Sequence, residues 1–371
     1  MAGIYVHIPF CHSKCNYCNF HVSTCITHKA EIIDAICREL YLQRDYLSEE
    51  AIETIYLGGG TPSILTTKEI NNILQTIRDN FTIITDAEIS LEANPHDLTT
   101  DKIAHLKNIG VNRISIGIQT FNEKLLKLLN RQDTIKDISI CLDKIKQYDF
   151  ENFNIDIIFA IFGQTIEDLT RDLDMLLKIN PPHISAYMLN IEPQTLFGYY
   201  ISKKILTEID DADVAEMFLL VDKVLTSAGY MHYEISNFCK KNFESRHNFN
   251  YWRNKKYLGV GPSAHSYNLI ERQWNVSNNI AYLKSINSGK IPTTKEMLTK
   301  ENKINEYIFT HLRTVDGVDM AFLKNEYNYT LSVETLQKIA YDNFVVINND
   351  NISLTSKGML LLNTICSILF I

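Results

Sequence analysis

Three cysteines with the spacing C-x3-C-x2-C limit what this 371-residue chain can bind more than any other part of its sequence. They are Cys11, Cys15 and Cys18. Soft thiolate ligands at short spacing favour an iron–sulfur cluster or zinc over hard cations. Three thiolates can hold three irons of a [4Fe–4S] cluster and leave the fourth iron open to a small chelating ligand. A structural zinc site would need a fourth Cys or His at matching spacing, and no second C-x2-C follows in the sequence.

A short strand is predicted directly before the cysteines. Residues 4–8 (IYVHI) have the composition of a strand, and Pro9 ends it. Parallel α/β barrels keep their reactive groups on the loops that follow their strands. The order of strand and cysteine triplet resembles the radical S-adenosylmethionine (SAM) superfamily, which implies SAM bound beside the cluster. In that superfamily the aromatic residue before the last cysteine, here Tyr17, packs over SAM or the cluster.

The composition indicates a large protein without membrane spans. The chain is 45% hydrophobic and 22% charged, with a formal net charge of −8. No apolar run approaches the roughly 18 residues that a membrane-spanning helix needs, and the first residues lack the pattern of a signal peptide. We therefore expect a cytoplasmic protein whose eight cysteines are metal-bound or free, and leave open a peripheral membrane contact. The acidic charge balance argues against a nucleic-acid partner.

Strand and helix patterns alternate over residues 1–190. Further strands are expected at residues 52–57, 88–92, 113–118, 153–159 and 183–189. Helices are expected at 67–79, 100–107 and 165–178, and two helical stretches over about 122–148. Six βα units predict an α/β fold with a parallel sheet and outer helices, arranged as a partial (β/α)6 barrel.

The rest of the chain is expected to form an extension and a smaller domain. We place the barrel in residues 1–205, an extension and connector in 206–298, and a smaller C-terminal helical, winged-helix-like domain in 299–371. Within these, we expect a tight glycine-rich loop at 257–265, an irregular connector at 275–298 and one apolar helix at 356–369.

Polar residues and glycines stand at the ends of successive predicted strands. Backbone without a Cβ lets a ligand approach closely, carboxylates suit ribose hydroxyls or an ammonium, and arginine suits a carboxylate. SAM carries all of these groups, whereas any single residue could be only a surface charge or a strand-end hydrogen bond. The predicted SAM-binding residues are Tyr5, Tyr17, Gly59, Gly60, Thr61, Glu92, Gln119, Arg131 and Asp156.

A closer family resemblance runs over nearly the whole chain. Residues 5–11 (YVHIPFC), 58–63 (GGGTPS), 92–95 (EANP) and 112–119 (NRISIGIQ) resemble the oxygen-independent coproporphyrinogen III oxidase family. Its true oxidases usually have C-x3-C-x2-C-x-C and a long extension before the cluster loop. Here Phe20 stands at the fourth cysteine position and ten residues precede Cys11. Both differences favour the other branch, the HemW-like heme chaperones.

A second motif agrees with that branch. His247, Tyr251 and Trp252 lie in residues 246–253 (RHNFNYWR), which resemble the H-N-x-x-Y-W motif by which HemW-like proteins bind heme. A neutral imidazole can ligate heme iron, and aromatic faces suit a macrocycle. A histidine beside aromatic residues can equally be a packed, hydrogen-bonded one, so the atom that touches iron stays open.

The resemblance implies a heme chaperone with a [4Fe–4S] cluster and SAM that delivers heme to an acceptor hemoprotein. It also implies a homodimer. The alternatives are an oxidase that decarboxylates coproporphyrinogen III and a radical-SAM enzyme with another substrate.

The chain departs from the family at residues 160–164 (AIFGQ), where G-L-P-x-Q is usual. That departure predicts a different local turn and puts the shape of the nearby pocket wall in doubt.

Overall fold

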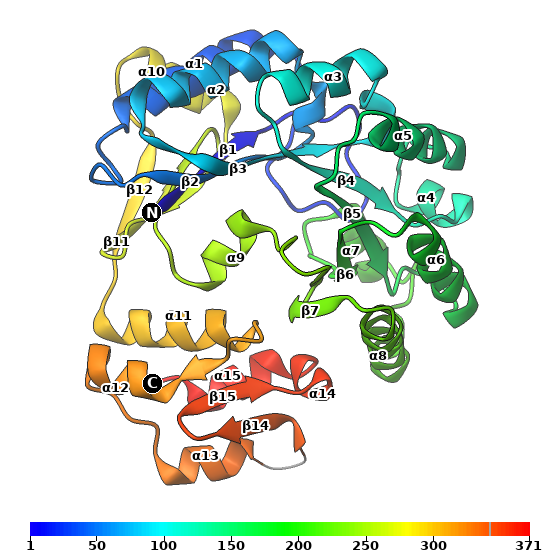
Figure 1. The fold of residues 1–371 in the computed structure, drawn as a ribbon, viewed down its shortest axis with the longest axis vertical. Helices are drawn as coiled ribbons and strands as arrows, with labels where there is room; N and C mark the ends of the chain where they lie inside the picture. Colours follow the sequence, from blue (N-terminus) through cyan, green and yellow to red (C-terminus); the bar gives the residue numbers. More distant parts are fainter. Residues whose placement is uncertain (341–342) are drawn as a thin grey trace.

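The computed structural model describes residues 1–340 and 343–371 and is built on one twelve-stranded sheet (Figure 1). Its centre is six strands that pair in parallel and in chain order. They are β1 (Ala2–Ile8), β2 (Ile52–Gly59), β3 (Ile83–Ala93), β4 (Arg113–Gln119), β5 (Phe153–Phe159) and β6 (His183–Met188). The sequential strand order with intervening helices confirms the predicted partial barrel.

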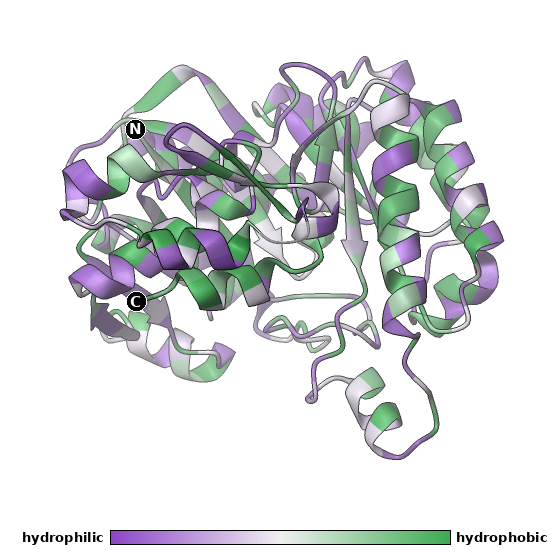
Figure 2. Cartoon of the chain, turned by 90° about the horizontal axis from the view of Figure 1, so that it is seen from below, coloured by the Kyte–Doolittle hydropathy of each residue, from purple (hydrophilic) through white to green (hydrophobic). Residues whose placement is uncertain are grey.

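Amphipathic helices cover the outer face of the sheet. They are α1 (Lys29–Leu42), α2 (Thr67–Asn80), α3 (Thr100–Asn108), α4 (Glu123–Leu128), α5 (Ile135–Gln147) and α6 (Ile166–Ile179). In α2, Thr66 caps the first turn in a capping box, and the buried side chains recur with helical spacing from Ile70 to Ile77. Each such apolar side chain contributes about 1.5–3 kcal/mol on burial. Figure 2 shows hydrophobic and hydrophilic residues on different sides of these helices.

Two short 3-10 helices follow strands of the barrel and help to shape its rim. They are η1 (Pro62–Ile64) after β2 and η2 (Pro95–Asp97) after β3. After β6 come α7 (Leu196–Ser202) and α8 (Asp211–Ser227), and then β7 (Met231–Glu234) and β8 (Asn237–Cys239). Strand β8 pairs antiparallel with β6 and closes that side of the parallel set.

The other side of the sheet is extended by residues that were expected to be a loop and a connector. The expected connector is wrong, and the expected loop is found only as the turn at residues 261–264. Strand β9 (Tyr257–Val260) pairs in parallel with β1, and β10 (His265–Tyr267), β11 (Glu271–Asn275) and β12 (Thr293–Met297) continue antiparallel. Helix α10 (Asn279–Asn287) lies between the last two strands. The outer strand β12 is exposed at four of its five residues, so it lacks the apolar alternation that marks a strand.

A buried carboxylate fastens this extension to the barrel. Glu39 of α1 is fully buried and accepts hydrogen bonds from the Gly261 amide (2.8 Å), the Tyr282 hydroxyl (2.6 Å), Asn275 (2.7 Å) and Gln43 (2.7 Å). Burial raises the pKa of Glu39, while these donors oppose the shift. Three of the donors belong to residues 261–282, so one side chain joins helix α1 to the sheet extension.

The C-terminal segment forms a smaller unit with its own apolar core. It contains α11 (Lys300–Leu312), β13 (Val318–Asp319), α12 (Met320–Tyr327), α13 (Val333–Ile339), β14 (Val345–Asn348), β15 (Asn351–Leu354), α14 (Ser356–Met359) and α15 (Leu362–Leu369). The last three strands form an antiparallel sheet in the order β13-β15-β14. The single helix expected at 356–369 is two helices, because the chain turns at 360–361 and thereby buries both Leu362 and Ile365. The division into 1–205, 206–298 and 299–371 stays a prediction.

The departure from the family turn at residues 160–164 has a clear backbone consequence. Ala160 takes a left-handed conformation (φ 58°), which a glycine would adopt without strain. Phe162 packs edge-on against Phe197 at 5.0 Å between ring centroids.

Among the described residues, no helix is both long and apolar enough to cross a membrane.

Replacing Glu39 with alanine is expected to destabilise the fold by about 3 kcal/mol or more, because four buried donors lose their acceptor. Urea unfolding of the cluster-free protein measures the change. Glu31 lies on the exposed side of the same helix, so Glu31→Ala should shift stability by no more than about 0.5 kcal/mol. Equal effects of the two substitutions would contradict the role given to Glu39.

Candidate functional site

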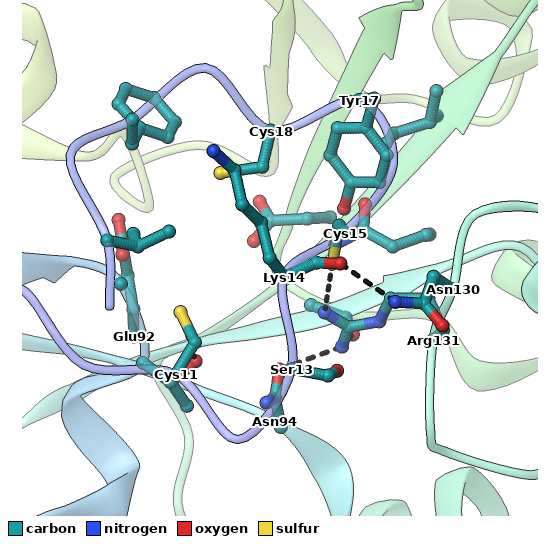
Figure 3. A pocket seen from close by; sticks show the side chains of 18 of the residues that line it. Cys11, Ser13, Lys14, Cys15, Tyr17, Cys18, Glu92, Asn94, Asn130 and Arg131 are labelled. Atoms are coloured by element: carbon teal, nitrogen blue, oxygen red, sulfur yellow. Dashed lines mark hydrogen bonds between the residues drawn. The ribbon is translucent and has the colours of Figure 1, made fainter. Parts of the chain in front are cut away.

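A cavity of about 390 Å³ opens at the carboxyl ends of the parallel strands. Its wall gathers residues from five strand ends and from the loop after β1 (Figure 3). Every residue predicted to bind the cluster or SAM lines this cavity except Tyr5. The lining set is Cys11, Cys15, Tyr17, Cys18, Gly59, Gly60, Thr61, Glu92, Gln119, Arg131 and Asp156.

The cysteine loop is held against the neighbouring strand ends by backbone hydrogen bonds. The Gly60 amide donates to the Ile8 carbonyl at 2.8 Å, and the Thr61 amide donates to the Phe10 carbonyl at 2.7 Å. A Cβ on Gly60 would lie 2.5 Å from the Phe10 carbonyl oxygen, so the close approach requires glycine at this position. On the far side, Asn130 donates to the Lys14 carbonyl at 2.8 Å.

The three thiols share one chemical environment. The Thr61 hydroxyl donates to the Cys11 sulfur at 3.4 Å, and Arg131 donates to the Cys15 sulfur at 3.9 Å. Burial raises the pKa of Cys11 to about 11 and also raises the pKa of Cys18, and a bound metal cluster would reverse that shift. Three soft donors from one loop over a cavity fit an iron–sulfur cluster that has one open iron. Phe20, at the fourth cysteine position of the oxidases, is 69% exposed and lines the cavity.

Glu92 presents a carboxyl group between the ends of β2 and β3. Its oxygens accept hydrogen bonds from the Tyr56 hydroxyl at 2.8 Å and from the Gly59 amide at 3.0 Å. Burial raises the pKa of Glu92 to about 7; the Tyr56 bond opposes the shift and nearby Asp156 adds to it. Gly59 has φ 105° and a Cβ there would lie 2.5 Å from the His7 ring. The residues thus provide a cradle with a carboxylate, which fits the amino group of SAM.

Two further strand ends complete the wall. Gln119 takes a left-handed backbone conformation (φ 73°) where the pairing of β4 with β5 shifts register, a strain of about 1–2 kcal/mol in a non-glycine residue. Asp156 accepts hydrogen bonds from Ser115 (3.1 Å) and Asn154 (2.7 Å), and burial raises its pKa. Backbone strain of this kind concentrates at functional sites.

Arg131 is fixed by partners that sequence reasoning missed. Its guanidinium donates to Asn94 (2.8 Å) and to the Gly117 carbonyl (2.6 Å), and it forms an ion pair with Asp133 (3.1 Å). The signal for Asp133 was available, since a buried arginine needs an acidic partner and Asp133 lies two residues away. Nothing in the sequence pointed to Tyr56 as a donor to Glu92.

The heme motif lies elsewhere, toward the amino ends of the strands. It forms helix α9 (Arg246–Trp252), which Figure 1 shows between the sheet and the C-terminal unit. The His247 ring is buried against β1 and β2 and stacks on Tyr56 at 5.1 Å. Its Nδ1 hydrogen-bonds with the Thr54 hydroxyl at 2.8 Å and its Nε2 with the Tyr251 hydroxyl at 2.8 Å. Burial lowers the pKa of His247 to about 3, so the imidazole is neutral.

Neither ring nitrogen of His247 is therefore free to ligate iron in this conformation. The alternative of a packed, hydrogen-bonded histidine describes the arrangement seen here. Two other motif residues, Trp252 and Arg253, contact the C-terminal unit. The Arg313 guanidinium lies 4.4 Å from the centre of the Trp252 ring. Arg253 forms an ion pair with Asp316 at 2.8 Å. The motif residues are brought together, but as a closed joint between two parts of the chain.

Tyr5 and the turn at 160–164 both lie outside the described cavity wall. Tyr5 lies beside both Tyr56 (6.2 Å) and His247 (6.4 Å), which stack on each other, and its hydroxyl bonds with Nδ1 of His7 at 3.1 Å. It thus belongs to the ring stack inside the barrel, and a SAM role for Tyr5 stays a prediction. The changed turn does not alter the cavity wall directly.

Comparison with known proteins places the two parts of the chain in families. Residues 5–176 match the Radical SAM superfamily, and residues 298–361 match the HemN C-terminal domain. The solved structure of coproporphyrinogen III oxidase (HemN) from Escherichia coli superposes with a TM-score of 0.87 at 24% identity. It covers 100% of this chain and 90% of that chain. At this identity the likeness shows the fold alone.

Curated relatives match over nearly the full length. The heme chaperone HemW of Buchnera aphidicola (strain APS) is 35% identical, over 99% of this chain and 97% of its own length. The HemW proteins of Lactococcus lactis and Bacillus subtilis are 34% and 32% identical, over 97% and 98% of this chain and 95% and 98% of their own lengths. The chain belongs to the HemW family of heme chaperones, within the radical SAM superfamily.

Proposed function

We propose that this chain binds heme and delivers it to an acceptor hemoprotein, using a radical-SAM scaffold that carries a [4Fe–4S] cluster and SAM. The observation that carries the proposal is an intact H-N-x-x-Y-W motif, His247 to Trp252, in a chain similar over nearly its whole length to curated heme chaperones. The motif also lies at a joint between two parts of the chain, where a conformational change can open it.

In this proposal the cavity holds the cluster and SAM. Cys11, Cys15 and Cys18 hold the cluster, whose open iron supplies the binding site for the amino and carboxylate groups of SAM. Glu92, whose carboxylate is held by the Gly59 amide, accepts a hydrogen bond from the amino group, and Arg131 neutralises charge at the Cys15 thiolate. Gln119 and Asp156 offer hydrogen-bonding groups for the remainder of the ligand.

Heme binding requires the joint at α9 to open. Because both nitrogens of His247 are engaged by Thr54 and Tyr251, heme must displace at least one of these bonds to gain a histidine ligand. Displacing Tyr251 would free Nε2 and leave the Thr54 bond to orient the ring.

The oxidase reading is not favoured. Its support is the fold likeness to HemN, at 24% identity, whereas relatives of 32–35% identity carry the chaperone name. Phe20 in place of a fourth cysteine points the same way. The homodimer implied by the family stays a prediction.

The cluster assignment has a direct test. Cys15→Ser should abolish the brown iron–sulfur absorbance after anaerobic reconstitution, because serine replaces one of three thiolates. Cys25→Ser is the matched control, since Cys25 is exposed just beyond the loop and its sulfur contacts Thr27. The control should keep its full iron and sulfide content. An intact spectrum in the Cys15 variant would reject the assignment.

The affinity for SAM should depend on pH through Glu92. Its pKa of about 7 in the free protein means that the carboxyl is mostly neutral at about pH 6 and mostly charged at about pH 7.5. The charged carboxylate accepts the stronger hydrogen bond from the amino group of SAM. SAM binding to the cluster-loaded protein should therefore tighten over this range.

Two variants sharpen that test. Glu92→Gln should weaken binding by about tenfold at pH 7.5 and flatten the pH dependence. Tyr56→Phe removes the bond that lowers the Glu92 pKa, so its profile should shift to higher pH. Calorimetric titration measures all three proteins, and wild-type affinity in Glu92→Gln would exclude the role given to Glu92.

Heme titration of the cluster-loaded protein, followed by the Soret band, tests the central proposal. The wild type should bind heme stoichiometrically, and His247→Ala should weaken binding. Tyr251→Phe keeps the imidazole and the aromatic ring but removes the bond that occupies Nε2, so heme should associate faster than with the wild type. An absence of binding in the wild type would contradict the chaperone proposal. Unchanged binding in His247→Ala would show that another residue ligates the heme iron.

A further inference from the structure

We propose that His12, His96 and Asp97 form a binding site for one divalent transition-metal ion of the Zn²⁺ class at the rim of the cavity. His12 follows Cys11 in the cysteine loop, and the other two residues belong to η2, after β3. Two imidazoles and one carboxylate with an open side form a donor set that such ions prefer. The proposal rests on these side chains and does not depend on the proposed heme function.

The three ligand atoms already converge. Nε2 of His12 lies 3.0 Å from Oδ1 of Asp97, Nε2 of His96 lies 3.6 Å from the same oxygen, and all three atoms lie within 4.8 Å of one another. Metal–ligand bonds of about 2.0–2.1 Å in a tetrahedral site separate the ligand atoms by about 3.3 Å. Small side-chain adjustments therefore suffice to place one ion between them.

Neighbouring side chains hydrogen-bond to two of the proposed ligands, His96 and Asp97. Such hydrogen bonds commonly orient the ligands of a metal ion. His96 bonds through Nδ1 to Oδ1 of Asp133 at 2.7 Å, and the Asp133 side chain is 2% exposed. With the Nδ1 proton directed at this carboxylate, the lone pair of Nε2 faces the proposed site. Ser63 donates to Oδ2 of Asp97 at 2.6 Å, so Oδ1 is the oxygen that faces the two imidazoles.

A simple hydrogen-bonded cluster accounts for the arrangement less well. The bond between His12 and Asp97 satisfies those two groups. It leaves Nε2 of His96, held in place by Asp133, without a hydrogen bond to the same oxygen, because their separation of 3.6 Å is too long for one. A cation at the centre engages all three atoms at once. The side chains of His12 and His96 are 38% and 30% exposed, so an ion has access from solvent.

A metal at this position would fasten the cysteine loop to the end of β3. The loop contributes His12, and η2 contributes His96 and Asp97, which lie 84 and 85 positions further along the chain. Binding would therefore restrain one side of the loop that carries the three thiols.

The test is equilibrium dialysis of cluster-reconstituted protein against Zn²⁺, with zinc, iron and sulfide counted in each sample. The wild type should retain one zinc per chain with a Kd below about 100 µM. His12→Ala and His96→Ala should each weaken binding at least tenfold, and Asp133→Asn by about 10–100-fold. His28→Ala is the matched control, because this exposed histidine contacts only one carboxylate, Glu31, and it should bind zinc like the wild type.

Equal iron and sulfide counts across the variants show that zinc has not entered the thiol site. Anomalous diffraction at the zinc edge should then place the ion between the three side chains. Failure of the wild type to retain zinc, unchanged affinity in both histidine variants, or a zinc peak at the cysteines would each overturn the proposal. These outcomes are independent of the heme titration, so failure of one proposal leaves the other standing.

Discussion

The parallel register of the six central strands is the condition on which the cavity depends. Ile8 pairs with Gly59 and Gly117 pairs with Asp156 across neighbouring strands, so the chain turns toward the same edge after each of them. A slip of one residue in any pair would turn the inward side chains outward. The cysteine loop has no regular structure of its own and takes its position from these ends, chiefly through the Gly60 and Thr61 amides.

Sequence patterns predicted the parts of the fold that bury continuous apolar runs. Strand β5 was predicted at its observed bounds, because both of its faces are covered and its residues are almost all apolar. Strands β9 to β12 were missed. The edge strand β12 is largely exposed, and helix α10 beside it buries only Tyr282 and Ile286. For such elements the position in the sheet, which the local sequence does not encode, decides the structure.

The candidate site was predictable to the extent that it follows strand ends, and unpredictable where it depends on long-range pairing. The strand-end residues converge as expected, but the partners that tune them come from elsewhere, as Tyr56 does for Glu92. The clearest case is His247, whose partner Thr54 lies 193 positions away in the chain. The motif identified a family correctly, but left open whether its imidazole would be packed and hydrogen-bonded or free to bind iron.

The length of strand β1 separates the His247 ring from the cysteine loop. A Cβ on Gly3 would contact the His247 ring, whereas Ile8 accepts the hydrogen bond that positions the cysteine loop. Five residues of extended strand between them span about 16 Å. A heme iron at His247 would thus be too far from the cavity for its ligands to be shared with a cluster there. Any exchange between the two centres would be a transfer of electrons through β1 and β2 or a mechanical displacement of these strands.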